Sequence, residues 1–153
     1  MEELTWRCKA FYDLTQDELY AILKLRSEVF IVEQECAYLD PDGDDQAAWH
    51  VLGEAEGNLL AYTRLLPPGL KYDCCSIGRV VTSSKIRRDG IGRILMERSI
   101  AYCRQQWPEQ GVTISAQQYL EPFYQSLHFV TESDAYLEDG IPHVRMHLPY
   151  SPT

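Results

Sequence analysis

Long apolar runs are missing from this sequence, and disulfide and zinc patterns are missing too. No segment approaches the roughly 18 uninterrupted apolar residues of a membrane helix, and the first residues, Met1-Glu2-Glu3-Leu4, lack the apolar run of a signal peptide. The five cysteines are odd in number and show no CxxC spacing. Reduced thiols in the cytoplasm are the simplest interpretation, so we expect a cytoplasmic protein with no membrane partner.

Positive charge is scarce as well. The 14 Lys and Arg residues stand against 23 Asp and Glu residues, which gives a formal net charge of −9 at pH 7. A general nucleic-acid binder needs a basic face that displaces counterions, so this balance argues against nucleic acid as a partner. An acidic field mildly favours cationic partners, although solubility alone also accounts for it.

The residues that are present predict one mixed domain over positions 1–153. Alternating or apolar runs predict strands at residues 4–12, 48–54, 59–66, 75–82, 112–116, 131–136 and 144–148. A Thr15-x-x-Glu18 capping box opens a first helix, whose apolar stripe is interrupted by Arg26. Further helices are expected at residues 90–107 and 121–127. The mixture predicts an α+β or α/β domain around a mixed sheet.

A basic, glycine-bearing stretch lies between the expected strand at 75–82 and the expected helix at 90–107. It reads Arg87-Arg88-Asp89-Gly90-Ile91-Gly92 and is followed by Arg93. A helix N-terminus has free backbone N–H groups and about half a positive charge, so it binds phosphate readily. The glycines let a ligand approach the backbone, and the arginines supply planar donors for phosphate oxygens. The stretch predicts a phosphate or pyrophosphate site, with a turn of solvated arginines as the alternative.

Other phosphate and metal motifs fit the sequence less well. A Walker loop needs Gly-Lys-Ser/Thr, which is missing, and a dinucleotide fingerprint needs a small residue three positions after Gly92, where Leu95 stands. In the aspartate-rich loop at 40–45, Gly43 is fourth and Val51 is twelfth, which does not satisfy the EF-hand pattern. We therefore expect no metal.

With these pieces the sequence resembles the GNAT superfamily of acyl-CoA N-acyltransferases, in which a strand, an RxxGxG loop and a helix hold the pyrophosphate of coenzyme A. The resemblance implies that acetyl-CoA is the acyl donor and that its pyrophosphate binds the stretch from Arg87 to Arg93. It implies that Val80, Val81 and Thr82 hydrogen-bond the pantetheine arm like an added strand. It also implies α/β/α layers, with helices flanking a mixed, mostly antiparallel sheet.

A second motif downstream carries the same resemblance. Gln117 follows a short strand, and Phe123-Tyr124 opens a segment that ends in His128-Phe129, where the family has glycine in place of histidine. The resemblance implies that Gln117 and Phe123 lie beside the acyl donor and that Tyr124 protonates the leaving thiolate. A core aromatic is the alternative for Tyr124. Glycine takes the left-handed conformation at the lowest energetic cost. A histidine at position 128 therefore makes a left-handed end of this helix less favourable.

A narrower resemblance, to ElaA-like proteins, is carried by residues 25–34, 40–44, 77–80 and 139–143 and extends over about residues 6–148. The Val29-Phe30-x-x-Glu33 run is also loosely similar to acyl-homoserine-lactone synthases. Those enzymes are longer and use acyl-carrier protein, so a synthase of this kind is an alternative that ranks below an acyl-CoA N-acyltransferase. A second alternative is a domain that binds acyl-CoA without turning it over, which the absence of an obvious base motivates.

The expected acceptor is a small-molecule or peptide amine. An amine of pKa ~10.4 is neutral in about one of 10³ molecules at pH 7, so a base is useful there, whereas an α-amine near 7.7–8.0 hardly needs one. Glu33 is the preferred base, because partial burial at the apolar end of a helix would raise its pKa. Glu121, His50, His143 and a water relay are the alternatives.

Two arginines within expected strands, Arg64 and Arg79, are candidates for holding a carboxylate on the acceptor, with internal salt bridges as the alternative. His50 and His143 are candidates for the same acceptor site. Terminal strands in such folds often pair between copies, so a homodimer and a monomer are both compatible with the sequence.

Overall fold

The structure, a computed structural model, describes residues 3–87 and 90–151, so Arg88 and Asp89 of the predicted loop lie outside the described residues. The strands are β1 (Thr5–Ala10), β2 (Trp49–Ala55), β3 (Asn58–Leu66), β4 (Cys75–Thr82), β5 (Val112–Gln117), β6 (Val130–Thr131), β7 (Tyr136–Glu138) and β8 (Ile141–Leu148). The helices are α1 (Gln16–Arg26), α2 (Ile91–Gln106) and α3 (Glu121–Gln125), with a π-helical continuation of α1, η2 (Ser27–Glu33). Short 3-10 turns are η1 (Phe11–Asp13), η3 (Asp45–Ala47) and η4 (Gln118–Leu120).

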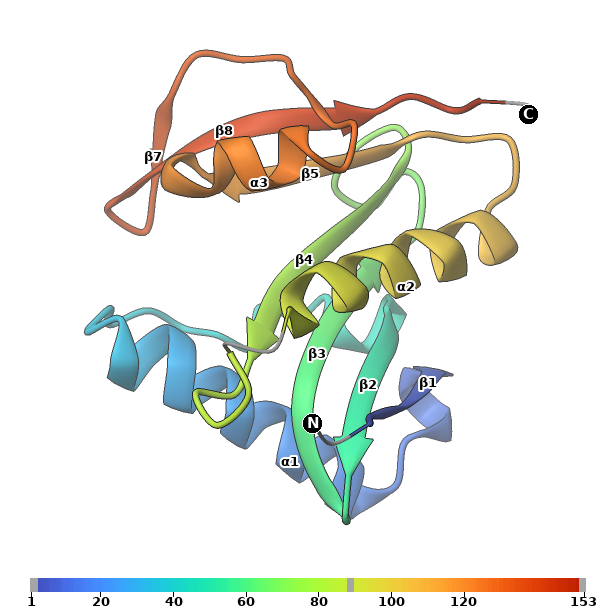
Figure 1. The fold of residues 1–153 in the computed structure, drawn as a ribbon, viewed down its shortest axis with the longest axis vertical. Coiled ribbons are helices and arrows are strands. Elements are labelled where there is room, and N and C mark those ends of the chain that lie inside the picture. The colour runs from blue at the N-terminus through green and yellow to red at the C-terminus, as the bar shows by residue number, and fades with distance from the viewer. Residues whose placement is uncertain (1–2, 88–89, 152–153) are drawn as a thin grey trace.

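One mixed sheet connects these strands in the order β1-β2-β3-β4-β5-β8-β6, with β7 paired to β8 (Figure 1). Among the described strands only the β4–β5 pairing is parallel, and α2 lies in the crossover between these two strands. Every other pairing is antiparallel. The expectation of a mixed, mostly antiparallel sheet flanked by helices is therefore confirmed.

The sheet has a hydrophobic layer on each face, because successive side chains of a strand point to opposite sides. On one face α2 packs its apolar side, including Leu95 and Met96, into the main core. On the other face Ile22 and Leu25 of α1 pack against a smaller cluster that includes Tyr62 of β3. These two clusters make the α/β/α layering.

The capping box predicted at the start of α1 is present. The Thr15 hydroxyl accepts from the Glu18 N–H at 3.0 Å, and a Glu18 carboxylate oxygen accepts from the Thr15 N–H at 2.8 Å. Glu18 also binds Lys9 and Arg7 of β1. Burial alone would raise the pKa of Glu18, but these hydrogen bonds and charges outweigh it and lower the pKa to about 2. The cap therefore also ties α1 to β1.

The expectation of a single strand over residues 131–136 was wrong. Two short strands stand there instead, and β8 begins at Ile141, before the expected start at residue 144. Asp139 and Gly140 both have positive φ, 51° and 77°. This is the backbone of a tight two-residue hairpin turn, which lets β7 fold directly back onto β8.

Candidate active site

The central sheet opens where β4 and β5 separate. Their parallel pairing is limited to Cys75 with Val112 and Ser76 with Thr113. Opposite Thr63 of β3, the strand β4 carries an extra residue, a bulge at Arg79 and Val80, and Arg79 has a positive φ of 50°. A bulge bends the strand that carries it. The remaining parts of β4 and β5 therefore border a gap in the sheet.

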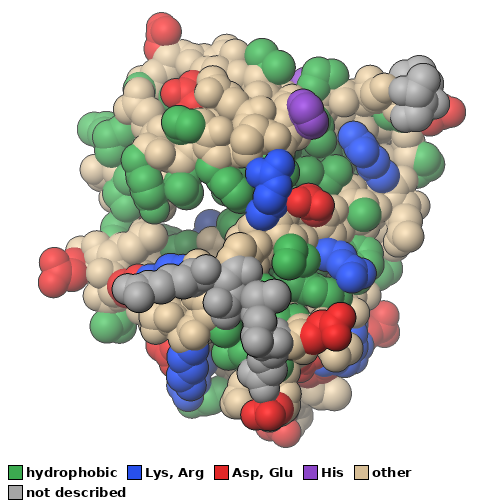
Figure 2. Space-filling model, in the orientation of Figure 1, with side chains coloured by type: hydrophobic (Ala, Val, Ile, Leu, Met, Phe, Trp, Pro, Cys, Tyr) green, Lys and Arg blue, Asp and Glu red, His purple; other side chains and the backbone are tan. Residues whose placement is uncertain are grey.

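Two hollows meet at this gap. The first, which we call the α2 cleft, adjoins the N-terminus of α2 and is lined by Val29, Phe30, Glu33, Gln34, Val80, Val81, Thr82, Arg87, Gly92, Gln117, Tyr119, Leu120, Phe123 and Tyr124. Figure 2 shows the molecule hollowed between its two halves on this side, with hydrophobic side chains at the edge. The predicted residues Val80 to Thr82, Arg87, Gly92, Gln117, Phe123 and Tyr124 are thus brought to one cleft.

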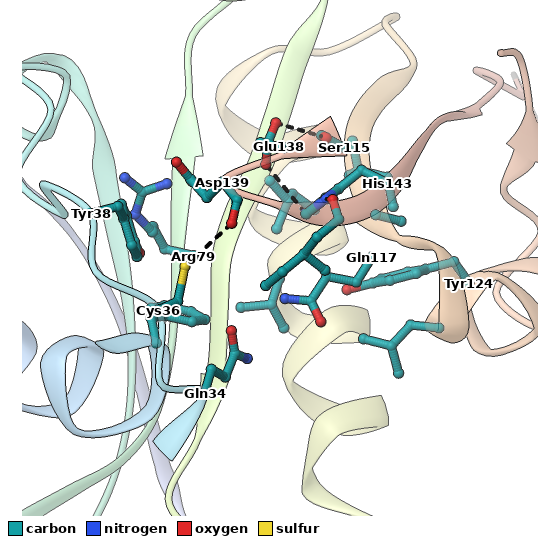
Figure 3. Close-up of a pocket in the computed structure, with 18 residues that line it drawn as sticks. Gln34, Cys36, Tyr38, Arg79, Ser115, Gln117, Tyr124, Glu138, Asp139 and His143 are labelled. Carbon is teal, nitrogen blue, oxygen red and sulfur yellow. Dashed lines mark hydrogen bonds and ion pairs between the residues drawn. The ribbon is translucent and has the colours of Figure 1, made fainter. Parts of the chain in front are cut away.

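The second hollow, the β7 cavity, lies on the other side of the same gap (Figure 3). It is lined by Phe30, Gln34, Cys36, Tyr38, Ile77, Gly78, Arg79, Val80, Ile114, Ser115, Ala116, Gln117, Leu120, Tyr124, Glu138, Asp139, Ile141 and His143. Val80, Gln117 and Tyr124 belong to both hollows. A molecule in one hollow can therefore reach a molecule in the other.

The N-terminus of α2 is built by its glycines. Gly90 is the N-cap in the left-handed conformation, with φ of 69°, and Ile91 is buried in the core. A Cβ on Gly92 would meet no atom within 4 Å, so the space beside the first turn is open. The first N–H groups of this 16-residue helix have no partner within the helix and suit an anion.

The arginines of the loop have different roles. Arg87 borders the α2 cleft, where it donates to the Thr82 carbonyl oxygen at 3.2 Å and to Glu33. Arg93 instead donates to the Ser126 hydroxyl at 2.9 Å and to its carbonyl oxygen at 3.3 Å. The expectation that Arg93 faces the phosphate site is thereby corrected, because its guanidinium is directed to the end of α3.

Glu33 also departs from expectation. Its side chain is exposed rather than partly buried, and it forms an ion pair with Arg87. That hydrogen bond and charge lower the pKa of Glu33 instead of raising it. A carboxylate with a lowered pKa is a weaker base, so the preference for Glu33 as the base is corrected.

Tyr124 is buried among aromatic residues and also lines both hollows. Its ring packs edge-on against Phe123 and Phe129, with centroids 5.1 and 5.8 Å away, and the residue is 5% exposed. Figure 3 shows its hydroxyl directed toward Gln117, which lines both hollows as well. Burial raises the pKa of Tyr124, so the phenol stays protonated at neutral pH.

His50 and Arg64, both proposed for the acceptor, lie inside the protein on the α1 side of the sheet. The His50 ring is fully buried between the Tyr62 hydroxyl, at 2.6 Å, and the Asp45 carbonyl oxygen, at 3.0 Å. Burial lowers the pKa of His50. Arg64 is buried against Asp42 and Asp45. Both expectations are corrected, because these side chains are occupied by internal partners.

Three arginines and three aspartates form a closed Arg–Asp ring under the β7 cavity. The ring runs Arg26–Asp45–Arg64–Asp42–Arg79–Asp40 and back to Arg26, with contacts of 2.7 to 3.4 Å. Arg26 interrupts the apolar stripe of α1 because it belongs to this ring. Arg79 is bound by Asp40 and Asp42, so it supports the cavity wall instead of offering an unpaired charge to an acceptor. This corrects its expected role.

A polar chain on the β7 hairpin reaches the other wall of the cavity. The Ser115 hydroxyl of β5 donates to Glu138 at 3.1 Å and is 2.6 Å from the Tyr136 hydroxyl. His143, 6% exposed, places Nε2 3.3 Å from Glu138. Sequence reasoning named His143 but missed Glu138 and Ser115. The Asp-Gly dipeptide at 139–140 was the available signal, because it predicts the hairpin that brings Glu138 beside His143.

Comparison with known proteins identifies the family. The model of the acetyltransferase (GNAT) domain matches residues 17–149. The chain belongs to the GNAT acetyltransferase family. Protein ElaA of Escherichia coli is 39% identical over 145 residues, covering 94% of this chain and 95% of that protein. The crystal structure of an acyl-CoA N-acyltransferase from Pseudomonas aeruginosa is 45% identical, has a TM-score of 0.90, and is matched over 95% of this chain and 99% of that one.

The crystal structure of Escherichia coli ElaA also matches this GNAT chain, with 38% identity, a TM-score of 0.89 and coverage of 94% of this chain and 98% of that one. The resemblance to ElaA-like GNAT proteins is therefore confirmed. A CoA-dependent acyl-homoserine lactone synthase is 16% identical with a TM-score of 0.78, over 97% of this chain and 84% of that one. This likeness shows a common fold alone.

The histidine that departs from the GNAT pattern takes the backbone of the glycine it replaces. His128 has φ of 75°, in the left-handed region, and its N–H donates to the Gln125 carbonyl oxygen at 2.9 Å. The next N–H, of Phe129, donates to the Tyr124 carbonyl oxygen at 3.1 Å. The turn after α3 is therefore formed as a glycine would form it, at the steric cost of a Cβ.

The described residues of this GNAT chain form neither a membrane-spanning helix nor a group of metal ligands. Over residues 3–87 and 90–151, no helix has both the length and the hydrophobicity needed to cross a bilayer. Within those ranges no three His, Cys, Asp or Glu side chains are grouped as a metal site requires. The aspartate-rich loop is instead occupied by the arginines of the ring.

Proposed function

We propose that this protein, as one domain over residues 1–153, transfers the acetyl group of acetyl-CoA to the nitrogen of a small-molecule or peptide amine, in the cytoplasm. The observation that carries this proposal is the gap between β4 and β5, which adjoins the free N-terminus of α2. A narrow ligand with amide groups and a pyrophosphate fits such a combination of unpaired strand and helix terminus.

The residues of the α2 cleft suit each part of acetyl-CoA. Val80 to Thr82 would take the pantetheine amides along the strand, and the first turn of α2 with Arg87 would take the pyrophosphate. Gly92 leaves room at that turn, because it has no Cβ. Gln117 and Phe123 line the opposite side of the cleft. The acetyl thioester would then lie at the wall that the two hollows share.

The two hollows support direct transfer in a ternary complex. An acyl donor in the α2 cleft and an amine in the β7 cavity would meet beside Tyr124, which lines both. Attack of the amine nitrogen on the thioester carbonyl carbon gives a tetrahedral intermediate, and cleavage of the C–S bond releases the thiolate. Tyr124, protonated at neutral pH, would give its proton to that sulfur.

Reversing the charge of Arg87 tests the acyl-donor site. We expect Arg87→Glu to weaken binding of acetyl-CoA by at least about tenfold, since a pyrophosphate would face an anion in place of a guanidinium. Isothermal titration calorimetry measures the change, and Arg98→Glu on the exposed side of α2 is the matched control. Unchanged affinity in Arg87→Glu would show that Arg87 does not bind the pyrophosphate. If the wild type does not bind acetyl-CoA at millimolar concentration, the proposed acetyl transfer is wrong.

Replacing Glu33 with glutamine distinguishes two roles for this residue, a general base and a counter-charge to Arg87. Because Glu33 pairs with Arg87 and adds negative charge beside the cleft, we expect Glu33→Gln to tighten acetyl-CoA binding by about two- to fivefold, the range of an exposed ion pair. Turnover should not fall. Calorimetry and a free-thiol assay measure the two quantities, with Glu28→Gln as control. A large loss of turnover with unchanged affinity would restore Glu33 as the base.

The free-thiol assay also distinguishes a catalyst from a domain that only binds acyl-CoA. Acetyl-CoA is incubated with the protein and a panel of primary amines, and release of the coenzyme A thiol is followed. Amine-dependent release is expected for an N-acetyltransferase. Binding of acetyl-CoA without thiol release for any amine would favour a domain that binds acyl-CoA without turning it over.

A further inference from the structure

The buried histidine of the β7 cavity has a defined tautomer. His143 Nδ1 is 2.7 Å from the Ile141 carbonyl oxygen, which can only accept a hydrogen bond, so Nδ1 carries the hydrogen. In the neutral ring, Nε2 therefore has the lone pair. The side chain is 8% exposed and lines the cavity.

The group beside Nε2 is also an acceptor. Glu138 Oε2 lies 3.3 Å from Nε2, while Oε1 is held by the Ser115 hydroxyl at 3.1 Å. The Tyr136 hydroxyl, 2.6 Å from Ser115, can donate to it in turn, and the Tyr136 ring stacks on His143. The carboxylate and the ring are thus both fixed in place. Nε2 and the Glu138 carboxylate thus face the same space and leave a position for an N–H donor.

The surplus charge of the cavity is negative. Among its other titratable or charged groups are Arg79 of β4, Cys36, Tyr38 and Tyr124. Arg79 is compensated by Asp40, and the Tyr38 hydroxyl donates to Asp40 as well. Cys36 donates its thiol to the Asp139 carbonyl oxygen. Among the described residues that line the cavity, Glu138 and Asp139 therefore face no permanent cation, since His143 is charged only when protonated.

We propose that the acceptor enters the β7 cavity as a primary ammonium ion, donates N–H groups to Glu138 and to His143 Nε2, and loses one proton to that nitrogen. This rests on the proposed function and deepens it, because it names the class of acceptor and the base. Ser115 and Tyr136 hold Glu138 and act as positioning residues. An imidazole nitrogen held beside a carboxylate would accept the proton of the ammonium without Glu33.

The ammonium gives one proton to His143 Nε2, and the neutral amine attacks the thioester carbon to form the C–N bond. As the C–S bond breaks, Tyr124 gives its proton to the sulfur. The second proton of the nitrogen passes to the Tyr124 oxygen and restores the phenol. Amide and the free thiol of coenzyme A leave, and His143 returns its proton to solvent. No oxidant, metal or further reactant is needed.

The test compares His143→Gln with wild type over pH 6 to 10, using acetyl-CoA with 1,4-diaminobutane, lysine and glycinamide. We expect kcat/KM for the best amine to fall by about 10²-fold at pH 7, and the loss to shrink as pH rises and the amine becomes neutral in solution. Affinity for acetyl-CoA should stay within about twofold. Glu138→Gln should raise KM for the amine at least tenfold, because the ammonium loses its counter-charge.

His147→Gln is the matched control, because His147 lies on the same strand and bonds Thr113 at 3.1 Å, away from the cavity. A His143→Gln variant that loses activity but keeps the pH profile of the wild type would assign His143 a structural role and overturn the proposal. Wild-type activity in His143→Gln would also overturn the proposal. If the wild type acetylates none of the amines, the proposed function fails first. Transfer that is insensitive to both substitutions would overturn this inference alone.

Discussion

Tyr124→Phe is expected to lower kcat for acetyl transfer by roughly 10²- to 10⁴-fold, the range of a general acid. The phenol is buried at the wall common to both hollows, where burial raises its pKa and keeps it protonated. Burial also destabilises a leaving thiolate, which therefore draws the proton toward sulfur. Phenylalanine keeps the ring contacts with Phe123 and Phe129 and removes only the hydroxyl.

Free-thiol release measures kcat for this variant, and calorimetry measures the dissociation constant of acetyl-CoA, which should change less than about twofold. Tyr20→Phe, on the exposed side of α1, removes a hydroxyl from a residue that is 72% exposed and should leave kcat unchanged. If Tyr124→Phe turns over as fast as the wild type, the proton must reach the sulfur by another route, and Tyr124 is only a core aromatic.

Asp45→Ala is expected to reduce the free energy of unfolding by about 3–5 kcal/mol. Asp45 accepts from both Arg26 and Arg64, which are themselves buried, so its removal leaves two guanidinium groups without their shared counter-charge. Such a loss is a large part of the stability of an ordinary domain, about 5–15 kcal/mol. Chemical denaturation followed by circular dichroism measures it.

Asp44→Ala is the control for the ring, since it removes the same charge from the same loop. Residue 44 contacts the ring through its backbone N–H, which donates to Asp42 Oδ1 at 3.0 Å. Alanine retains this hydrogen bond. We expect a change of less than about 1 kcal/mol there, as for other surface substitutions. A loss in Asp45→Ala no larger than in Asp44→Ala would show that the ring adds no net stability.

The ring also sets the expected response to acid. For Asp42 and Asp45 burial alone would raise the pKa, but hydrogen bonds and charges from the arginines outweigh it and lower the pKa of both. A carboxyl with a lowered folded-state pKa contributes stability that is complete above its unfolded pKa, near 3.9, and is lost as pH falls toward the folded value. Unfolding free energy should therefore fall below about pH 4, less steeply in Asp45→Ala.

Local signals predicted those parts of the fold that local physics determines. The bounds expected for β4 match the structure, and the cap at Thr15 and the end of α2 before Pro108 follow from side-chain chemistry within one turn. The π-helical segment after α1 has no such signal. The Arg–Asp ring could be predicted only as separate arginines in apolar runs and an aspartate-rich loop, because its members pair across 14 to 39 residues.

The same division holds for the site. The RxxGxG loop and Tyr124 could be found because each is a contiguous motif next to a helix. Glu33 and Arg93 were misplaced because the orientation of a side chain depends on partners from other elements, Arg87 in one case and Ser126 in the other. The pairing of Glu138 with His143 needed the hairpin turn at residues 139–140, whose dipeptide could have indicated it.

The gap between β4 and β5 has a consequence for association between molecules. An unpaired strand edge at the rim of a sheet is a template on which another chain can add, and it promotes aggregation. Here the unpaired edges belong to β4 and β5 and face each other in the interior of the sheet. The opposite edge of β4 is paired with β3, and the opposite edge of β5 is paired with β8. A folded neighbour is too wide to enter, whereas a single extended ligand is not. The protein thus keeps backbone groups available for recognition without exposing them to its own copies.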